Sequence, residues 1–214
     1  MTFFKKIPLF NTYNRETMCA FNITDFKFKI LANSKIYDII KILKFNLQNR
    51  DIIMRMKTTC FDKQIDENET IFKHFKEGED EELRCTIQNS VFYDENRIPL
   101  IPMDISCEED EDYYIKNFGV FICNKDGQPI GFGQIIINKR LYTIVNLGVI
   151  DEYRQQGYGE LLVKYLVGFC YNNSINNIYI RVEKKNTKAL SLYNKIGFRE
   201  IKSIITWRRN IDLF

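Results

Sequence analysis

The chain has 214 residues, of which 45% are hydrophobic and 28% are charged, and its net charge at pH 7 is only +3. These values are ordinary for a soluble globular protein, and the length suits one sizeable domain with or without an extension. They argue against a nucleic-acid-binding or membrane-surface protein, and no apolar stretch is long enough to span a bilayer.

The cysteines and the single histidine, His74, argue against a metal site or a disulfide framework, because the six cysteines are scattered without a C-x-x-C pair. Residues 1–10 contain two lysines but no long apolar core, so we expect no secretory signal. The sequence therefore predicts a reduced, cytoplasmic protein without a metal. The cysteines are Cys19, Cys60, Cys85, Cys107, Cys123 and Cys170.

Residues 1–51 are predicted to form an extension, and residues 52–214 the main domain. Alternation over residues 26–31 favours a short strand, and Ser34 can cap a helix over residues 35–48. This strand–helix extension carries no chemistry that we can name. Its apolar face must be covered by the main domain, by a second copy of the chain or by a partner. Packing on the main domain is the simplest of these, and a homodimer stays open.

The main domain is predicted to begin with a strand and helices and to continue as an antiparallel meander. The expected helices are a short insertion at 66–78, a helix at 80–92 and one from about Asp104 that contains the acidic run at 108–112. Gly131 and Gly133 indicate a bulge or a close backbone contact. The expected strands are 52–57, 118–123, 130–137 and 142–150, with turns at 125–127 and 138–140.

The rest of the chain is organised around the stretch that follows the strand at 142–150. Gly157 and Gly159 stand two apart, just before an amphipathic helix at 160–171. The first N–H groups of a helix lack helical partners, and glycine lets an anion approach the main chain. A strand, a glycine loop and a helix start together predict a phosphate site, although a turn that merely needs two glycines would look the same.

A second motif follows a predicted parallel strand at 178–183. Asn186 is a good helix N-cap, and Gly197 can end that helix in a left-handed conformation with Phe198 packed back on the last turn. A terminal hairpin ending near residues 207–209 completes the predicted elements.

Both motifs resemble those of the GCN5-related N-acetyltransferase (GNAT) superfamily. Residues 154–159, Arg-Gln-Gln-Gly-Tyr-Gly, resemble its Q/R-x-x-G-x-G/A pyrophosphate loop. Residues 186–198 match every position of its later motif, N-x-x-A-x-x-L-Y-x-x-x-G-F. The resemblance covers roughly residues 52–214. It implies an α/β (α+β) fold with a mixed, mostly antiparallel sheet, a splayed parallel strand pair and flanking helices. The extension can then be the remnant of a duplicated domain, although we detect no internal repeat.

The resemblance also implies how acetyl-CoA binds. Its pantetheine arm is expected between the strands ending at Val149 and at Glu183, with the pyrophosphate on the glycine loop. Arg154 can add charge near the phosphates or form a surface salt bridge, and Asn186 can lie near the cofactor arm while it caps its helix. The implied cofactor-binding residues are Leu147, Gly148, Val149, Arg154, Gln155, Gln156, Gly157, Tyr158, Gly159 and Asn186.

Acetyl transfer needs a deprotonated amine, a donor for the oxyanion and a proton for the leaving thiolate. A backbone N–H near Val149 can stabilise the oxyanion. Tyr193 matches the tyrosine that the superfamily uses as general acid, although it can equally be a core aromatic.

The general base is not evident from the sequence. Histone-type relatives place a glutamate where this chain has Thr143, which cannot serve. Glu183 is a weak candidate, and Asn146 or Tyr142 can order a water that carries the proton away. The acidic run at 108–112 can attract a cationic amine, but such runs are more often solvated helix faces.

Two classes of function therefore stay open. The first is an N-acetyltransferase that moves an acetyl group from acetyl-CoA directly to a primary amine of unknown identity, on a small molecule, peptide or protein. The second is a non-catalytic module that binds CoA or acyl-CoA as a sensor or scaffold. Neither requires a metal, a nucleic acid or a membrane.

Overall fold

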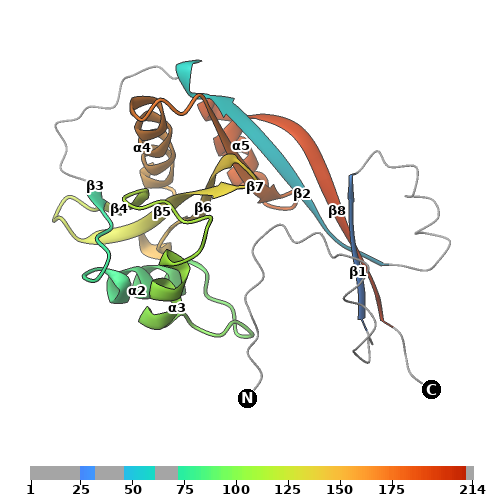
Figure 1. Cartoon of the computed structure of the whole chain (residues 1–214), viewed down its shortest axis with the longest axis horizontal. Helices are drawn as coiled ribbons and strands as arrows, with labels where there is room; N and C mark the ends of the chain where they lie inside the picture. The colour runs from blue at the N-terminus through green and yellow to red at the C-terminus, as the bar shows by residue number, and fades with distance from the viewer. Residues whose placement is uncertain (1–24, 32–45, 61–71, 211–214) are drawn as a thin grey trace.

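The computed structural model describes residues 25–31, 46–60 and 72–210 of the chain. These residues form one eight-stranded sheet in the order β1-β8-β2-β7-β6-β5-β4-β3 (Figure 1). Every pairing is antiparallel except that of β6 with β7. The strands are β1 (Asp25–Leu31), β2 (Asn46–Lys57), β3 (Phe72–His74), β4 (Gly119–Cys123), β5 (Pro129–Asn138), β6 (Leu141–Val149), β7 (Asn177–Glu183) and β8 (Arg199–Asn210).

Helices cover both faces of the sheet. On one face lie α4 (Tyr158–Asn172) and α5 (Thr187–Ile196), and on the other lie α2 (Glu81–Val91) and α3 (Pro102–Glu109) (Figure 1). Successive side chains of a strand point to opposite faces, and β5 shows both. Gly133 faces Leu166 of α4, whereas the Phe132 ring lies under Arg84 of α2.

Two clusters of buried side chains correspond to these two faces. The larger one joins β2, β4, β5, β6 and β7 to α4, and it includes Tyr193 of α5 and Phe198, which follows the end of that helix. The smaller one lies under α2 and α3 and consists of Phe75, Cys85, Ile87, Ile105, Phe121 and Phe132. Helices therefore pack on both faces of the half of the sheet that contains strands β4–β7.

The predicted fold class is confirmed: the sheet is mixed and mostly antiparallel, has one parallel pair and is flanked by helices. The predicted strand at 26–31 is present as β1, and the meander lies within one residue of its predicted bounds. The helices predicted at 80–92 and 160–171 are α2 and α4, although α4 begins two residues earlier, at Tyr158.

Four expectations about elements were wrong in part. Residues 72–74 of the predicted helical insertion form strand β3, which pairs with β4, and residues 66–71 lie outside the described residues. The helix α3 ends at Glu109, so most of the acidic run follows it. The predicted terminal hairpin is the single strand β8, because residues 199–210 contain no turn signal and pair with both β2 and β1.

The fourth concerns the N-terminal segment. Residues 46–48, placed at the end of a predicted helix, belong to β2, and most of that helix lies outside the described residues. The proposed division after residue 51 falls inside β2, so the extension and the main domain share one sheet.

Candidate active site

The parallel strands β6 and β7 meet only briefly and then separate. Their register contains two pairs, Thr143 with Tyr179 and Ile144 with Ile180. Beyond Ile144, β6 continues along β5 to Val149, while β7 continues along β2 to Glu183. The predicted splayed pair is therefore confirmed, and it opens toward the carboxyl ends of both strands.

A β-bulge distorts β6 where this opening begins. Phe132 pairs with Gly148 and Gln134 pairs with Val145, so Gly133 faces two residues, Asn146 and Leu147. Asn146 adopts a left-handed φ of 53°. A bulge twists the strand and re-aims the residues around it. The signal of Gly133 thus corresponds to a bulge, whereas Gly131 is a close contact, since a Cβ there would lie 2.6 Å from the Gly148 carbonyl oxygen.

The glycine loop lies at the open end of the two strands. After β6 a 3-10 turn (Asp151–Tyr153) leads to Gly157, which is the N-cap of α4 with a φ of 92°. Among the described residues, no side chain caps this helix. A Cβ added at Gly157 or Gly159 would meet no atom within 4 Å. The first N–H groups of α4 are therefore open to a ligand, which is the geometry that favours phosphate.

Arg154 forms the surface salt bridge that was one of its two predicted roles, and its place near the phosphates stays a prediction. Its guanidinium forms a salt bridge of 2.6 Å with Asp151. Its Nε donates to the Val149 carbonyl oxygen at 2.9 Å, and its Nη2 donates to the Val91 carbonyl oxygen at 3.0 Å. The side chain thus joins the loop to the end of β6 and to the end of α2. It also donates to the carbonyl group of Val149, which is one of the implied cofactor-binding residues.

A second polar side chain of the loop, that of Gln156, also turns back on the main chain. Gln156 donates from Nε2 to the Glu152 carbonyl oxygen at 2.9 Å, and Gln155 adopts a left-handed φ of 62°. The rings of Tyr153 and Tyr158 meet edge to face with centroids 6.1 Å apart. An anion at this helix start would be held chiefly by the main chain.

The second motif folds as its sequence predicts. Asn186 caps α5, because its Oδ1 accepts a hydrogen bond of 3.1 Å from the Ala189 N–H. Gly197 ends the helix with a φ of 122°. Tyr193 is buried beside Phe198, with ring centroids 6.0 Å apart. Burial raises the pKa of the Tyr193 phenol to about 12, so it is a proton donor at neutral pH.

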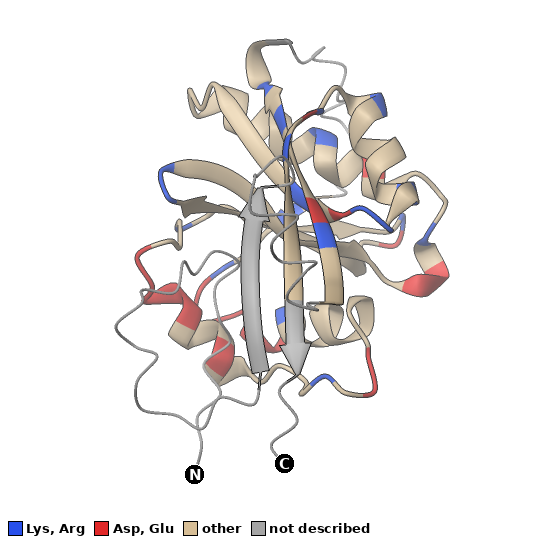
Figure 2. Ribbon diagram, turned by 90° about the vertical axis from the view of Figure 1, so that its right-hand side faces the viewer, with Lys and Arg blue, Asp and Glu red and all other residues tan. Residues whose placement is uncertain are grey.

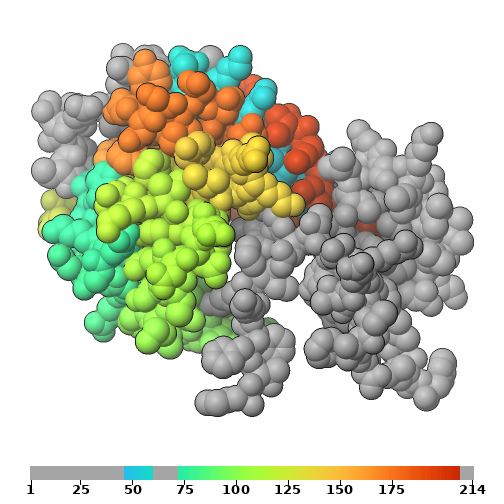
Figure 3. Space-filling model, viewed as in Figure 1, coloured from blue at the N-terminus to red at the C-terminus, as the bar shows by residue number. Residues whose placement is uncertain are grey.

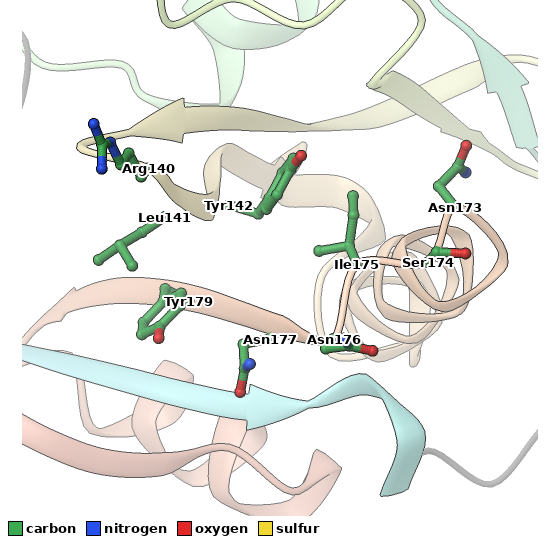
Figure 4. Close-up of a pocket in the computed structure, with 9 residues that line it drawn as sticks. All are labelled: Arg140, Leu141, Tyr142, Asn173, Ser174, Ile175, Asn176, Asn177 and Tyr179. Carbon is green, nitrogen blue, oxygen red and sulfur yellow. The ribbon is translucent and has the colours of Figure 1, made fainter.

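The side chains considered as general bases differ in their surroundings. Thr143 is buried and donates to the Leu141 carbonyl oxygen at 3.1 Å, and Glu183 pairs with Lys185 at 2.8 Å. Tyr142 lines a pocket at the other end of β6, where the segment after α4 approaches the sheet (Figure 4). That pocket is lined by residues 140–142, 173–177 and Tyr179. Seven residues of strand, about 23 Å, separate Tyr142 from Val149.

Asn146 belongs instead to a polar network that sequence reasoning missed. Its Nδ2 donates to Gln134 Oε1 at 3.3 Å, and the same oxygen accepts from Arg84 Nη2 at 2.8 Å. Arg84 is fully buried with its guanidinium over the rings of Phe75 and Phe132, and its Nη2 also pairs with Glu108. The network runs from α3 through α2 and β5 to the bulge. The signal that the sequence offered for this network was the presence of polar residues 84 and 88 beside the apolar positions of one helix face.

Carboxylates gather beside this network. In the lower half of Figure 2, acidic residues colour α2 and α3. Burial raises the pKa of Glu109, and the neighbouring carboxylates of Glu81 and Glu77 raise it further, while Arg84 lowers it. Glu77 accepts a hydrogen bond from the Tyr114 hydroxyl at 3.2 Å and pairs with Lys116 at 2.7 Å. This face of the sheet is thus suited to a cationic group.

The site has two sides that meet at the bulge. In Figure 3, the yellow segment around residue 150 lies between the green segment with α2 and α3 and the orange segments that follow. The glycine loop and the splayed strands can hold a nucleotide-linked chain, and the α2–α3 side can hold a second reactant. The described residues contain no group of three or more His, Cys, Asp or Glu side chains placed to hold a metal ion.

Comparison with known proteins agrees with this geometry. A model of the acetyltransferase (GNAT) family matches residues 84–198, which is more than half of the chain. The chain therefore belongs to the GNAT family. A GCN5-related N-acetyltransferase from Sphaerobacter thermophilus shares the fold with a TM-score of 0.70 at 16% identity, over 88% of this chain and 62% of that one.

Two curated relatives match parts of the chain. N-alpha-acetyltransferase 50 of Danio rerio is 32% identical over 75 residues, which are 35% of this chain and 44% of that protein. The [ribosomal protein bS18]-alanine N-acetyltransferase of Escherichia coli (strain K12) is 27% identical over 92 residues, 42% of this chain and 58% of that protein. The matches thus span about half the length of these relatives. None of the helices that the structure describes is long and apolar enough to cross a membrane.

Proposed function

We propose that the chain is an acetyl-CoA-dependent N-acetyltransferase that moves an acetyl group to a primary amine by direct transfer in a ternary complex. The observation that carries this proposal is the opening between β6 and β7 beyond Ile144, with the start of α4 at the same end. Strands that separate offer main-chain groups to an extended amide chain, and a helix start offers N–H groups to a pyrophosphate.

The residues fit this cosubstrate as follows. Main-chain groups of Leu147, Gly148 and Val149 line the opening for the pantetheine arm, although the Val149 carbonyl already accepts from Arg154. Residues 155–159 hold the pyrophosphate through the main chain, and Asn186 lies at the start of α5, after β7. Acetyl-CoA supplies the activated thioester.

Tyr193 is the general acid in this proposal. The transfer forms a bond between the amine nitrogen and the acetyl carbon and breaks the carbon–sulfur bond. The leaving thiolate, whose parent thiol has a pKa of about 8.5, takes a proton from the phenol. A backbone N–H near Val149 donates to the oxyanion that forms in between. Tyr193 then recovers its proton from solvent.

The amine must also lose a proton before or during attack. Asn146 is at the bulge, where the opening begins, and its amide can order a water that takes this proton to solvent. Thr143 donates its own proton within the sheet, and Glu183 is engaged with Lys185. We therefore assign Asn146 the role of holding that water.

Thiol release from acetyl-CoA, measured against polyamines, amino acids, aminoglycosides and peptides, tests this function. Turnover with any amine, together with binding of acetyl-CoA in calorimetry, supports it. Tight binding without turnover would favour a CoA-binding sensor or scaffold. Absence of binding would contradict both functions.

A further inference from the structure

A chain of hydrogen bonds runs from α3 to the bulge of β6, and each bond fixes the orientation of the next side chain. It begins at Arg84, whose guanidinium lies over the Phe75 and Phe132 rings. The same guanidinium pairs with Glu108 of α3. These contacts, together with the full burial of the side chain, hold Arg84 in place.

The orientation of the Gln134 amide follows from the chemistry of Arg84. A guanidinium donates hydrogen bonds and accepts none. Gln134 must therefore turn its carbonyl oxygen toward Arg84, and Oε1 accepts from Nη2 at 2.8 Å. Because Gln134 is completely buried in the middle of β5, its direction is set by this contact and not by solvent.

The same oxygen decides how the amide of Asn146 lies. Gln134 Oε1 also accepts from the Asn146 Nδ2 group at 3.3 Å. An amide carries its donor and its acceptor on opposite sides of one carbon, so the Asn146 carbonyl oxygen, Oδ1, points away from Gln134. Asn146 is only half-buried, and it lies two residues beyond Ile144, where β6 and β7 separate. Its Oδ1 is thus the end of the chain that a ligand or a water can reach.

The direction of that oxygen matters for the water that the proposed function gives to Asn146. A water that donates one O–H to Oδ1 gains electron density and becomes a better base. Such a water can accept the proton of the amine during attack and pass it to solvent. With the amide reversed, Nδ2 would donate to the water and make it a poorer base.

We infer that Gln134 is a positioning residue for acetyl transfer, which acts through Asn146 and is itself oriented by Arg84 and Glu108. This inference rests on the proposed function. It adds the atom that faces the reaction, Asn146 Oδ1, and the side chains that select this atom.

Replacing Gln134 tests the inference with the full chain and acetyl-CoA. Thiol release is measured with spermidine, glycinamide and Nα-acetyl-lysine amide as acceptors. Gln134→Met keeps the length of the side chain and removes the carbonyl oxygen, so kcat should fall about tenfold, the effect of one lost hydrogen bond. The Kd for acetyl-CoA should change little. An unchanged kcat would overturn the inference.

The conservative variant Gln134→Glu should recover most of the lost kcat. A carboxylate oxygen can accept from both Arg84 and Asn146, so the amide of Asn146 keeps its direction. This variant also keeps an acceptor beside the buried guanidinium and does not depend on the folding of Gln134→Met. A tenfold loss of kcat in Gln134→Glu would therefore overturn the inference by itself.

A double-mutant cycle distinguishes positioning from a purely structural role. Asn146→Gly removes the amide, and glycine suits the left-handed φ of 53° at the bulge. In that background Gln134→Met should cause no further loss of kcat, because the side chain through which Gln134 acts is absent. Losses that multiply would overturn the inference. So would a similar loss in the control Gln128→Met, which replaces an exposed glutamine just before the same strand.

The NMR signal of the Asn146 side-chain amide tests the chain of hydrogen bonds without turnover. The signal is assigned by its absence in Asn146→Gly. Its hydrogen exchange should become at least about fivefold faster in Gln134→Met and stay slow in Gln134→Glu, because only the first variant removes the acceptor. This change without turnover of any amine would support the oriented amide and contradict the acetyltransferase. Turnover with an unchanged signal would support the acetyltransferase and overturn the inference.

Discussion

Tyr193 lies in the larger core with only 8% of its surface exposed. Because burial favours the neutral form, the phenol keeps its proton at every pH at which the protein would work. A structural role in the core and a role as proton donor are compatible, and replacing only the hydroxyl separates them.

The first prediction is that Tyr193→Phe lowers turnover about a hundredfold or more, which is the usual effect of losing a general acid. The ring that packs against Phe198 is kept, so the melting temperature should change little. Steady-state rates and calorimetric affinity for acetyl-CoA measure both quantities. Equal turnover in the two proteins would show that the hydroxyl is only structural.

A second prediction concerns alkaline stability. The pKa of Tyr193 is about 12 in the folded protein and about 10 in an unfolded chain. The contribution of the buried phenol to the free energy of unfolding, up to about 3 kcal/mol, is therefore fully present below pH 10. It is lost as the pH rises toward 12. The free energy of unfolding, measured in urea, should fall more steeply over this pH range for the wild type than for Tyr193→Phe. Parallel pH profiles would contradict the assigned burial.

Gly159 allows a third prediction that separates folding from ligand binding. Its φ is not in the left-handed region and a Cβ there meets nothing within 4 Å, unlike Gly157 with its φ of 92°. Gly159→Ala should leave the melting temperature unchanged or raise it, because alanine favours helix. The added methyl group should weaken acetyl-CoA binding at least tenfold in calorimetry. Unchanged affinity would exclude this part of the loop as the pyrophosphate site.

At the scale of elements, the contact between α2 and β6 sets the shape of the site. Gly148 and Val91 lie so close that a Cβ at Gly148 would be 2.1 Å from a Val91 methyl group. Arg154 reinforces the contact by bonding carbonyl groups of both elements. Gly148 thus serves the packing of α2 against the end of β6.

The fourth prediction uses this contact. Gly148→Ala should destabilise the protein by about 1–3 kcal/mol, the usual cost of overpacking. The double variant with Val91→Ala should recover part of that loss, because the second change removes the methyl group that clashes. Urea denaturation of the two single variants and the double variant gives the coupling. Additive losses would mean that α2 does not press on Gly148.

Elements with strong local signals could be predicted, and those decided by tertiary pairing could not. Asn186 and Gly197 each cap a helix by a local mechanism that the sequence displays. Residues 72–74 instead form a strand because β4 is beside them, an effect that intrinsic propensity does not contain. Arg84 and Gln88 look like solvated positions of a helix until the sheet that buries them is known.

At the scale of the whole molecule, the strand order joins both ends of the described chain. β8 lies between β1 and β2, and β2 lies between β8 and β7. The buried Asp51 and the partly buried Arg181 form an ion pair between β2 and β7, and the Lys184 N–H donates to the Arg50 carbonyl oxygen at 2.8 Å. The N-terminal half of β2 therefore supports the end of β7, which borders the opening.

The fifth prediction compares two truncations. A chain that begins at Asn46 keeps all of β2 and should retain its affinity for acetyl-CoA. A chain that begins at Ile52 lacks the Asp51 carboxylate that pairs with Arg181. Its free energy of unfolding should be about 3 kcal/mol lower than that of the chain from Asn46. Thermal unfolding and calorimetry of both proteins give the comparison. Loss of acetyl-CoA binding in the longer of the two, the chain from Asn46, would place part of the site in the deleted residues.

The position of β8 also has a consequence for biosynthesis. Residues 199–210 must insert between two strands that leave the ribosome some 150 residues earlier, so β1 has no partner in this sheet until then. Such distant pairings make folding slow and leave strand edges exposed meanwhile. During synthesis, β1 and one edge of β2 are therefore surfaces on which a chaperone, or another nascent chain, can act first.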